Sequence, residues 1–144
     1  MLKDKVFLTQ TDTTIGFVSQ NSSKISHIKQ RPLDKYYIKA VNSLETLKSF
    51  VRVPQAHKNT VRRASKTTFI LPNTHSYRVI RDAHHLLLLN RLLWAYTSSA
   101  NLSGQEYDEA FAREVSDIVI EPLSPKSQAS HIYKLGRKTL KKIR

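Results

Sequence analysis

The chain has 144 residues, of which 40% are hydrophobic, and this size predicts one compact domain over residues 1–144. It contains no cysteine, which excludes disulfides and thiolate chemistry. Its apolar runs, such as 86–89, are far below the roughly 20 residues that cross a membrane, so we expect a cytoplasmic protein without membrane contact. The 24 Lys and Arg exceed the 11 Asp and Glu, and the resulting net charge of +13 favours a polyanionic ligand or partner.

The first quarter of the chain predicts two strands separated by a short helix. Residues 6–9 are strand-like and lead into the polar turn 10–13. Asn21 is a suitable cap for a helix that ends before Pro32, because proline disfavours helical geometry in the preceding residue. Tyrosine and β-branched residues over 36–41 then predict the next strand.

The second quarter predicts a helix, a loop and two strands. Asn42 and Glu45 form a capping-box pattern, which begins a helix that Pro54 ends. Residues 55–66 are charged and lack periodicity, so we expect a mobile loop. Strands are predicted over 67–71 and 77–81.

The remaining half continues the alternation of helices and strands. Asp82 caps a strongly apolar helix that runs to Leu93. The later elements are a strand at 94–97, a helix at 108–115, and strands at 117–121 and 131–135. This order predicts an α/β fold with an open, mixed sheet covered by helices.

Several common site types are excluded. Only three glycines are present, so neither a Rossmann fingerprint nor a Walker A loop can form, and no histidine spacing predicts a metal site. Three polar segments remain: 11–14, 29–32 and 99–101. Taken singly, each is typical of an ordinary feature, namely a local turn, a basic helix terminus and a loop.

In their order along the chain, these segments resemble the motifs of the YrdC family of threonylcarbamoyl-AMP synthases. The family's Pro-Thr-Asp/Glu-Thr turn is matched by 10–13, its Lys-x-Arg-Pro motif by 29–32, and its Ser-Ala-Asn-Leu-Ser-Gly motif in full by 99–104. Further matches are a Thr-bearing strand, an Arg-bearing strand, a Ser-Thr-Ile-Val-like strand and an Ile-Arg ending, at 67–71, 78–81, 130–133 and 143–144.

The resemblance implies a fold and a reaction. The fold is an open twisted α/β sheet with a basic concave cavity. The reaction condenses L-threonine, bicarbonate and ATP into threonylcarbamoyl-AMP and pyrophosphate, with Mg²⁺ accompanying the triphosphate. The product serves a downstream threonylcarbamoyl transferase complex, which modifies an adenosine in tRNA.

The resemblance also implies residue roles. Lys29 and Arg31 are expected to be catalytic, because their charges would hold the ATP phosphates and stabilise the departing pyrophosphate. The further expected ATP contacts are Thr68, Ser99, Asn101 and Ser130. The expected threonine contacts are Thr11 and Thr13, with Arg81 binding the substrate carboxylate.

The match is weaker on the threonine side, and a second function therefore stays open. Gln10 stands where the family has proline, and Ile15 where it has tyrosine. The alternative is a YrdC-like protein that binds RNA or a nucleotide without synthase activity. Two basic clusters, one free of acidic residues over 46–81 and one near the end of the chain, predict contacts with tRNA or double-stranded RNA through Arg62, Arg63, Lys141 and Lys142.

Overall fold

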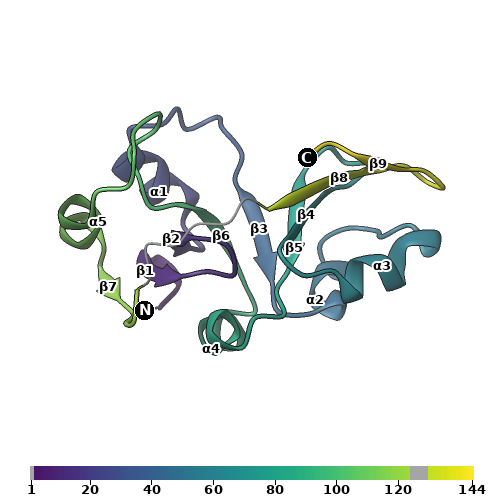
Figure 1. Ribbon diagram of the computed structural model, residues 1–144, viewed down its shortest axis with the longest axis horizontal. Coiled ribbons are helices and arrows are strands. Elements are labelled where there is room, and N and C mark those ends of the chain that lie inside the picture. Colours follow the sequence, from purple (N-terminus) through teal and green to yellow (C-terminus); the bar gives the residue numbers. More distant parts are fainter. Residues whose placement is uncertain (1, 124–129) are drawn as a thin grey trace.

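One mixed β-sheet organises the protein in the computed structural model, which describes residues 2–123 and 130–144 (Figure 1). The strand order is β7-β1-β2-β6-β3-β5-β4-β8-β9, in which β1–β7, β3–β5 and β4–β8 are parallel pairs and the other neighbours are antiparallel. The strands are β1 (Phe7–Gln10), β2 (Ile15–Ser19), β3 (Ile38–Val41), β4 (Thr67–Ile70), β5 (Ser76–Val79), β6 (Trp94–Ser99), β7 (Ile118–Val119), β8 (His131–Leu135) and β9 (Leu140–Lys142). The predicted open α/β architecture is confirmed.

Five α-helices and two short 3₁₀ turns accompany the sheet in the described part of the chain. They are α1 (Ser22–Lys29), α2 (Leu44–Lys48), α3 (Lys58–Arg63), α4 (Ala83–Leu92), α5 (Glu109–Val115), η1 (Leu2–Asp4) and η2 (Gln55–His57). In Figure 1, α1 and α5 lie at one end of the molecule, α3 lies toward the other end near the β8–β9 hairpin, and α4 lies between them. None of the helices described is long and apolar enough to span a membrane.

Three hydrophobic clusters attach these helices to the sheet. One cluster joins α2 and α3 to the β3–β5–β4–β8 part, and a second joins α4 to β1, β2, β3 and β6. A third packs α5 against β1 and β2. Ala40 belongs to the second cluster and its neighbour Val41 to the first, because successive residues of a strand point to opposite faces. Strand β3 therefore links the two halves of the molecule.

Two strands were not predicted. All five residues of β2 are buried, and a buried strand carries no alternation of polar and apolar residues for a sequence pattern to detect. In β9 all three residues are exposed, so the strand is defined by its pairing with β8 rather than by burial. Strand β2 is held between β1 and the distant β6, and β9 is held by its antiparallel pairing with the preceding strand β8.

The loop predicted over 55–66 is wrong: η2 and α3 occupy most of it. Helix α3 is too short for a clear amphipathic pattern, and the burial of Val61 against the first cluster stabilises it. The start of α2 also differs, since the capping side chain is Ser43 and not Asn42. Its Oγ accepts a hydrogen bond from the N–H of Thr46 at 3.2 Å, and the helix ends at Lys48, well before Pro54.

Candidate functional site

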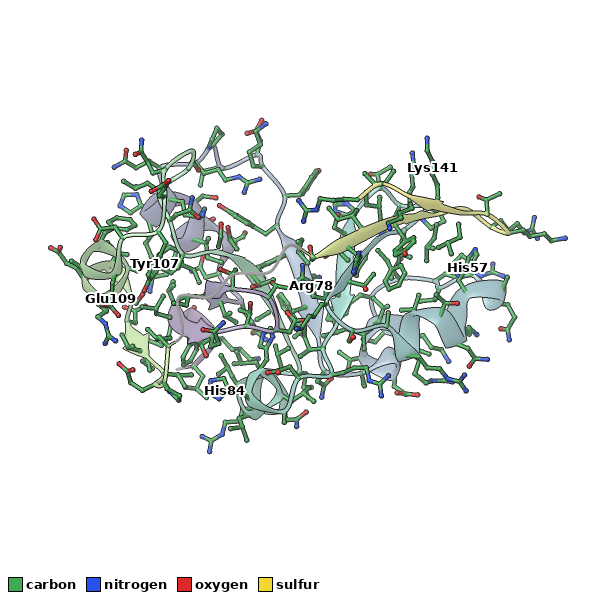
Figure 2. The ribbon with its side chains drawn as sticks, viewed as in Figure 1. His57, Arg78, His84, Tyr107, Glu109 and Lys141 are labelled. Atoms are coloured by element: carbon green, nitrogen blue, oxygen red, sulfur yellow. The ribbon has the colours of Figure 1, made fainter. Side chains whose placement is uncertain are left out.

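A polar cavity of about 570 Å³ lies where the two halves of the sheet meet. Its walls come from the β1–β2 turn, the end of β6, the residue before β8 and the end of the chain. In Figure 2, Arg78 lies near the centre of the molecule and Tyr107 toward α5, and both line this cavity. The described lining includes two arginines, Arg78 and Arg144, and no carboxylate, so the cavity favours an anionic ligand.

The β1–β2 turn forms one wall, and local hydrogen bonds fix it. The Thr11 hydroxyl donates to the Thr14 carbonyl at 2.6 Å and accepts from the Thr14 N–H at 3.1 Å. Gly16 allows this turn to approach β6 closely: a Cβ there would lie 2.9 Å from both the Ser98 carbonyl oxygen and Cγ2 of Thr11. Both predicted threonine contacts, Thr11 and Thr13, line the cavity.

Lys29, the last residue of α1, is 3% exposed and holds the segment that follows β6. Its ammonium donates to the carbonyls of Ser99 and Asn101, at 2.6 and 2.8 Å, and to the Asn101 side-chain oxygen at 3.2 Å. The Ser99 hydroxyl donates to that same side-chain oxygen at 2.5 Å. The segments 29–32 and 99–101, which lie far apart in the sequence, are therefore in direct contact through Lys29.

Burial changes the proton affinity of Lys29. Loss of solvent, reinforced by the nearby positive charge of Arg31, lowers the pKa of the Lys29 ammonium to about 8. Arg31 itself lies against Tyr37, with its guanidinium carbon 4.7 Å from the ring centroid, and donates to the Tyr36 carbonyl at 3.3 Å. Within the described chain, neither Lys29 nor Arg31 lines the cavity. Lys29 lies behind Ser99 and Asn101, to which it donates, and Arg31 lies against Tyr37.

Arg78 on β5 is a site residue to which the sequence gave no role. Its guanidinium donates to Asp12 at 3.1 Å, to Thr13 at 3.2 Å and twice to the Thr68 hydroxyl, at 3.1 and 2.8 Å. These bonds use four of its five N–H groups. Because Arg78 lines the cavity, its remaining Nη2 hydrogen, which no acceptor takes within residues 2–123 and 130–144, is available to an anionic group of a ligand.

Asp12 balances the buried charge of Arg78, and the two side chains are only 4% and 6% exposed. On the other side of Asp12 lies His85 of α4, whose Nδ1 is 4.0 Å from the carboxylate. Neither ring nitrogen of His85 has a hydrogen-bond partner in the described structure. Burial lowers the pKa of His85 to about 4 despite the carboxylate, so the ring is neutral at neutral pH.

Arg144 is a second cation that received no predicted role. Its Nε donates to the Ser130 carbonyl and its Nη2 to the Ser130 hydroxyl, both at 3.0 Å. Both residues line the cavity, so the predicted ATP contact Ser130 is placed there beside a positive charge. The Ile-Arg ending at 143–144 was the only sign of this residue in the sequence, and its role depends on the pairing of the chain end with β8.

The structure places the remaining predicted residues at three locations. Thr68 lies behind Arg78 and reaches the cavity only through it. Arg81, predicted to bind the threonine carboxylate, is exposed and donates to the Arg63 carbonyl at 2.7 Å. It lines a shallow surface depression together with Arg62 and Arg63, away from the cavity, so Arg78 replaces it as the arginine placed to contact a cavity ligand. Arg81 lies two residues beyond the end of β5 at Val79, so the strand that directs Arg78 into the cavity does not extend to Arg81.

Lys141 and Lys142, predicted to bind RNA, lie on β9 and are exposed. They point to opposite faces of the hairpin, because Lys141 pairs with Lys134 and Lys142 pairs with Tyr133. Figure 2 shows Lys141 on the hairpin, far from α5 at the other end of the molecule. The four predicted RNA contacts come from α3, which carries Arg62 and Arg63, and from β9, and RNA binding through them stays a prediction.

Magnesium would depend on the nucleotide for binding. Hydroxyl and amide oxygens line the cavity, but the described lining offers no carboxylate, and Asp12 is engaged by Arg78. No group of three metal-ligating side chains occurs within the described residues. These side chains fit a Mg²⁺ ion that is held mainly by triphosphate oxygens and water rather than by a protein cage.

No protein-family profile matches the chain. A curated relative, the uncharacterized protein MG259 of Mycoplasma genitalium, is 33% identical over 99 residues, which is 69% of this chain but only 21% of that protein. The chain thus spans about a fifth of the length of this relative.

Solved structures match the fold. P. abyssi Sua5, solved in complex with L-threonine, has a TM-score of 0.82 at 19% identity, covering 97% of this chain and 50% of that one. E. coli YciO has a TM-score of 0.75 at 19% identity, covering 97% and 82%. The protein has the YrdC-like fold. Full-length HypF, solved in a phosphate- and nucleotide-bound form, has a TM-score of 0.78 at 13% identity, and the match covers 99% of this chain and 27% of HypF.

Proposed function

We propose that the protein is a threonylcarbamoyl-AMP synthase, which condenses L-threonine, bicarbonate and ATP into threonylcarbamoyl-AMP and pyrophosphate for the modification of tRNA. The observation that carries this proposal is the convergence of Arg78, Ser99, Asn101 and Arg144 on one basic cavity. The fold is shared with P. abyssi Sua5, which has been solved with L-threonine bound, and this supports a threonine-binding role for the cavity.

Threonine and ATP each have complementary groups in the cavity. The free Nη2 hydrogen of Arg78 suits a carboxylate, and the hydroxyl of Thr13 lies next to it. Arg144, Ser130, Ser99 and Asn101 provide a positive charge and neutral hydrogen-bonding groups for ATP. Lys29 acts indirectly, by positioning Ser99 and Asn101, because its three N–H groups already donate to the two carbonyls and to the Asn101 side chain.

The reaction then needs positioning more than covalent chemistry. The amine of threonine attacks bicarbonate with loss of water, or carbon dioxide with loss of a proton, to give a carbamate. A carbamate oxygen then attacks the α-phosphorus of ATP, and the bond from that phosphorus to the α–β bridging oxygen breaks. Pyrophosphate leaves with the negative charge that develops on the bridging oxygen. Arg144, Arg31 and Lys29 contribute positive charge around this region, so stabilisation of that charge and alignment of the substrates supply the acceleration.

Pyrophosphate release from ATP tests the proposal. The purified protein should release pyrophosphate only when threonine and bicarbonate are both present. Arg78→Ala should abolish the threonine-dependent release, because the substrate carboxylate loses its partner, and Lys29→Ala or Arg31→Ala should abolish release as well. Arg91→Ala, which removes an exposed arginine of α4 outside the cavity, is the matched control and should keep full activity.

One outcome would favour the alternative function instead. A folded protein that binds ATP but releases no pyrophosphate with threonine and bicarbonate present would contradict the synthase. It would indicate a YrdC-like nucleotide- or RNA-binding protein. Delivery of the product to a threonylcarbamoyl transferase complex is part of the proposal and is tested by adding that complex and measuring threonylcarbamoyladenosine in tRNA.

A further inference from the structure

A second depression, of about 300 Å³, lies on the face of the sheet opposite the cavity and takes no part in the proposed reaction. Lys39, Tyr77 and Tyr96 line it from neighbouring strands. They share a face because Lys39 pairs in register with both tyrosines. The cavity residue Arg78 follows Tyr77 directly in β5, so its side chain points to the other face.

Aromatic rings form the walls of this depression. Tyr36 is 74% exposed, and its ring meets that of His75 edge to face, with the centroids 4.6 Å apart. The Lys39 ammonium lies 5.5 Å from the centroid of the Tyr96 ring and also over Trp94, at 4.6 Å. An exposed tyrosine and a half-buried histidine, beside a cation that is already held against aromatic rings, resemble the stacking platforms that bind unpaired bases.

A basic depression adjoins the aromatic one across the β4–β5 turn. Pro72 of this turn lines the basic depression, and the next residue, Asn73, lines the aromatic one. The cations of the basic depression are Arg52, Arg137 and Lys138. None of them takes part in an ion pair within the described chain, and all three are exposed. Their charge is therefore available to an external anion.

We propose that this face binds a single strand of nucleic acid, with one unpaired base stacked in the depression walled by Tyr36, His75 and Tyr96 and the neighbouring phosphates held by Arg52, Arg137 and Lys138. The two depressions supply the two interactions that sequence-independent binding of single strands requires, base stacking and phosphate contacts. In a duplex the bases are stacked on one another and expose no face to such a pocket. An acidic protein would match the cations but would not explain the aromatic walls. The site differs from the predicted RNA contacts, of which it includes none.

Fluorescence anisotropy with a labelled single-stranded RNA of mixed sequence tests the site. The wild-type protein should bind it more tightly than the same RNA annealed to its complement. Tyr36→Ala should weaken binding by about fivefold or more, because a stacked base loses its partner, and Tyr36→Phe should keep the affinity. Leu33→Ala is the matched control: Leu33 lies in the same loop and is also 74% exposed, but it lines neither depression.

The phosphate contacts are tested by salt dependence. The double variant Arg137→Ala/Lys138→Ala should bind more weakly and lower the slope of log affinity against log salt by about 1.4, since each phosphate contact to a single strand contributes about 0.7. Lys3→Ala/Lys5→Ala removes the same charge elsewhere and should leave the slope unchanged. Tighter binding of the duplex, an unaffected Tyr36→Ala variant, or equal losses in the two double variants would each overturn the proposal.

Discussion

At the scale of single residues, buried ionisable groups lie in the wall of the cavity and behind it. Arg78 is balanced by Asp12, while Lys29 is balanced by carbonyl and amide oxygens and not by a carboxylate in the described structure. His85 has no hydrogen-bond partner there. Burial away from water disfavours the protonated, positively charged form of a lysine or histidine, and this lowers the pKa of both Lys29 and His85.

The depressed pKa of Lys29 predicts opposite pH effects on binding and on stability. ATP affinity should fall as the pH rises through about 8, because the amine then loses its charge. The free energy of unfolding should rise between about pH 8 and the unfolded value near 10.5, since the unfolded chain binds the proton more tightly. Calorimetric titration of ATP and urea unfolding across this range measure the two effects.

Lys29→Met is the test variant for this prediction, and Lys24→Met on the same helix is its control, because the side chain of Lys24 is 43% exposed. Lys29→Met should bind ATP more weakly at pH 7 and show a flat pH profile. An unchanged profile in Lys29→Met would assign the titration to another group.

His85 predicts an acid-sensitive fold. Its pKa is lowered to about 4 by burial, whereas an unfolded histidine titrates near 6.5, so the unfolded chain binds more protons between these values. Stability should therefore fall by about 2 kcal/mol between pH 7 and pH 5 on this account. Urea unfolding at the two pH values should show this loss in the wild type and in His27→Leu, which changes an exposed histidine, but not in His85→Leu.

At the scale of elements, local signals and pairing contribute differently. The N-caps of α1 and α4 were predicted from the sequence as Asn21 and Asp82, and each side chain accepts a hydrogen bond from a backbone N–H of its helix. In α5 the first residue of the predicted helix, Asp108, is the cap. Strand β2 had no comparable signal, although it carries the turn that forms one cavity wall. Its position depends on β1 and β6, which pair with it on either side.

Gly16 shows how closely β2 must approach its neighbours. Gly16→Ala should lower the free energy of unfolding by about 1–3 kcal/mol, because the new methyl group would overlap the backbone oxygen of Ser98, which cannot move without breaking the sheet. Urea denaturation measures the loss. Gly104→Asn is the control: no atom lies within 4 Å of a Cβ there, and asparagine tolerates its positive φ. Equal stability of Gly16→Ala and the wild type would contradict the close approach.

At the scale of the whole molecule, the cavity is an interface between two halves with separate cores. Its lining extends from Thr11 to Arg144, so a ligand in it contacts nearly the full span of the sequence. The net charge of +13 is distributed so that cations line this cavity and also the basic depression on the opposite face. The proposed synthesis and the proposed nucleic-acid binding therefore use opposite faces of one sheet.

Binding across the two halves predicts stabilisation of the entire fold. ATP at about one hundred times its dissociation constant should add about 2.7 kcal/mol to the free energy of unfolding and raise the melting temperature by several degrees. Differential scanning fluorimetry measures this shift. Threonine should raise the melting temperature of the wild type but not of Arg78→Lys, whereas Arg91→Ala should keep both shifts. A threonine shift that survives in Arg78→Lys would remove Arg78 from the site.

The sequence by itself determined the α/β class, the caps of two helices and the polar segments around Thr11, Lys29 and Ser99, because these depend on local composition and on motif order. Tertiary structure alone decided which arginine faces the cavity, since Arg78 on β5 points inward, whereas Arg81 lies beyond the end of that strand and on the surface. It also brought Arg144 to Ser130 and paired β2 with strands on both sides. Those features depend on contacts between residues distant in the chain, which no local pattern encodes.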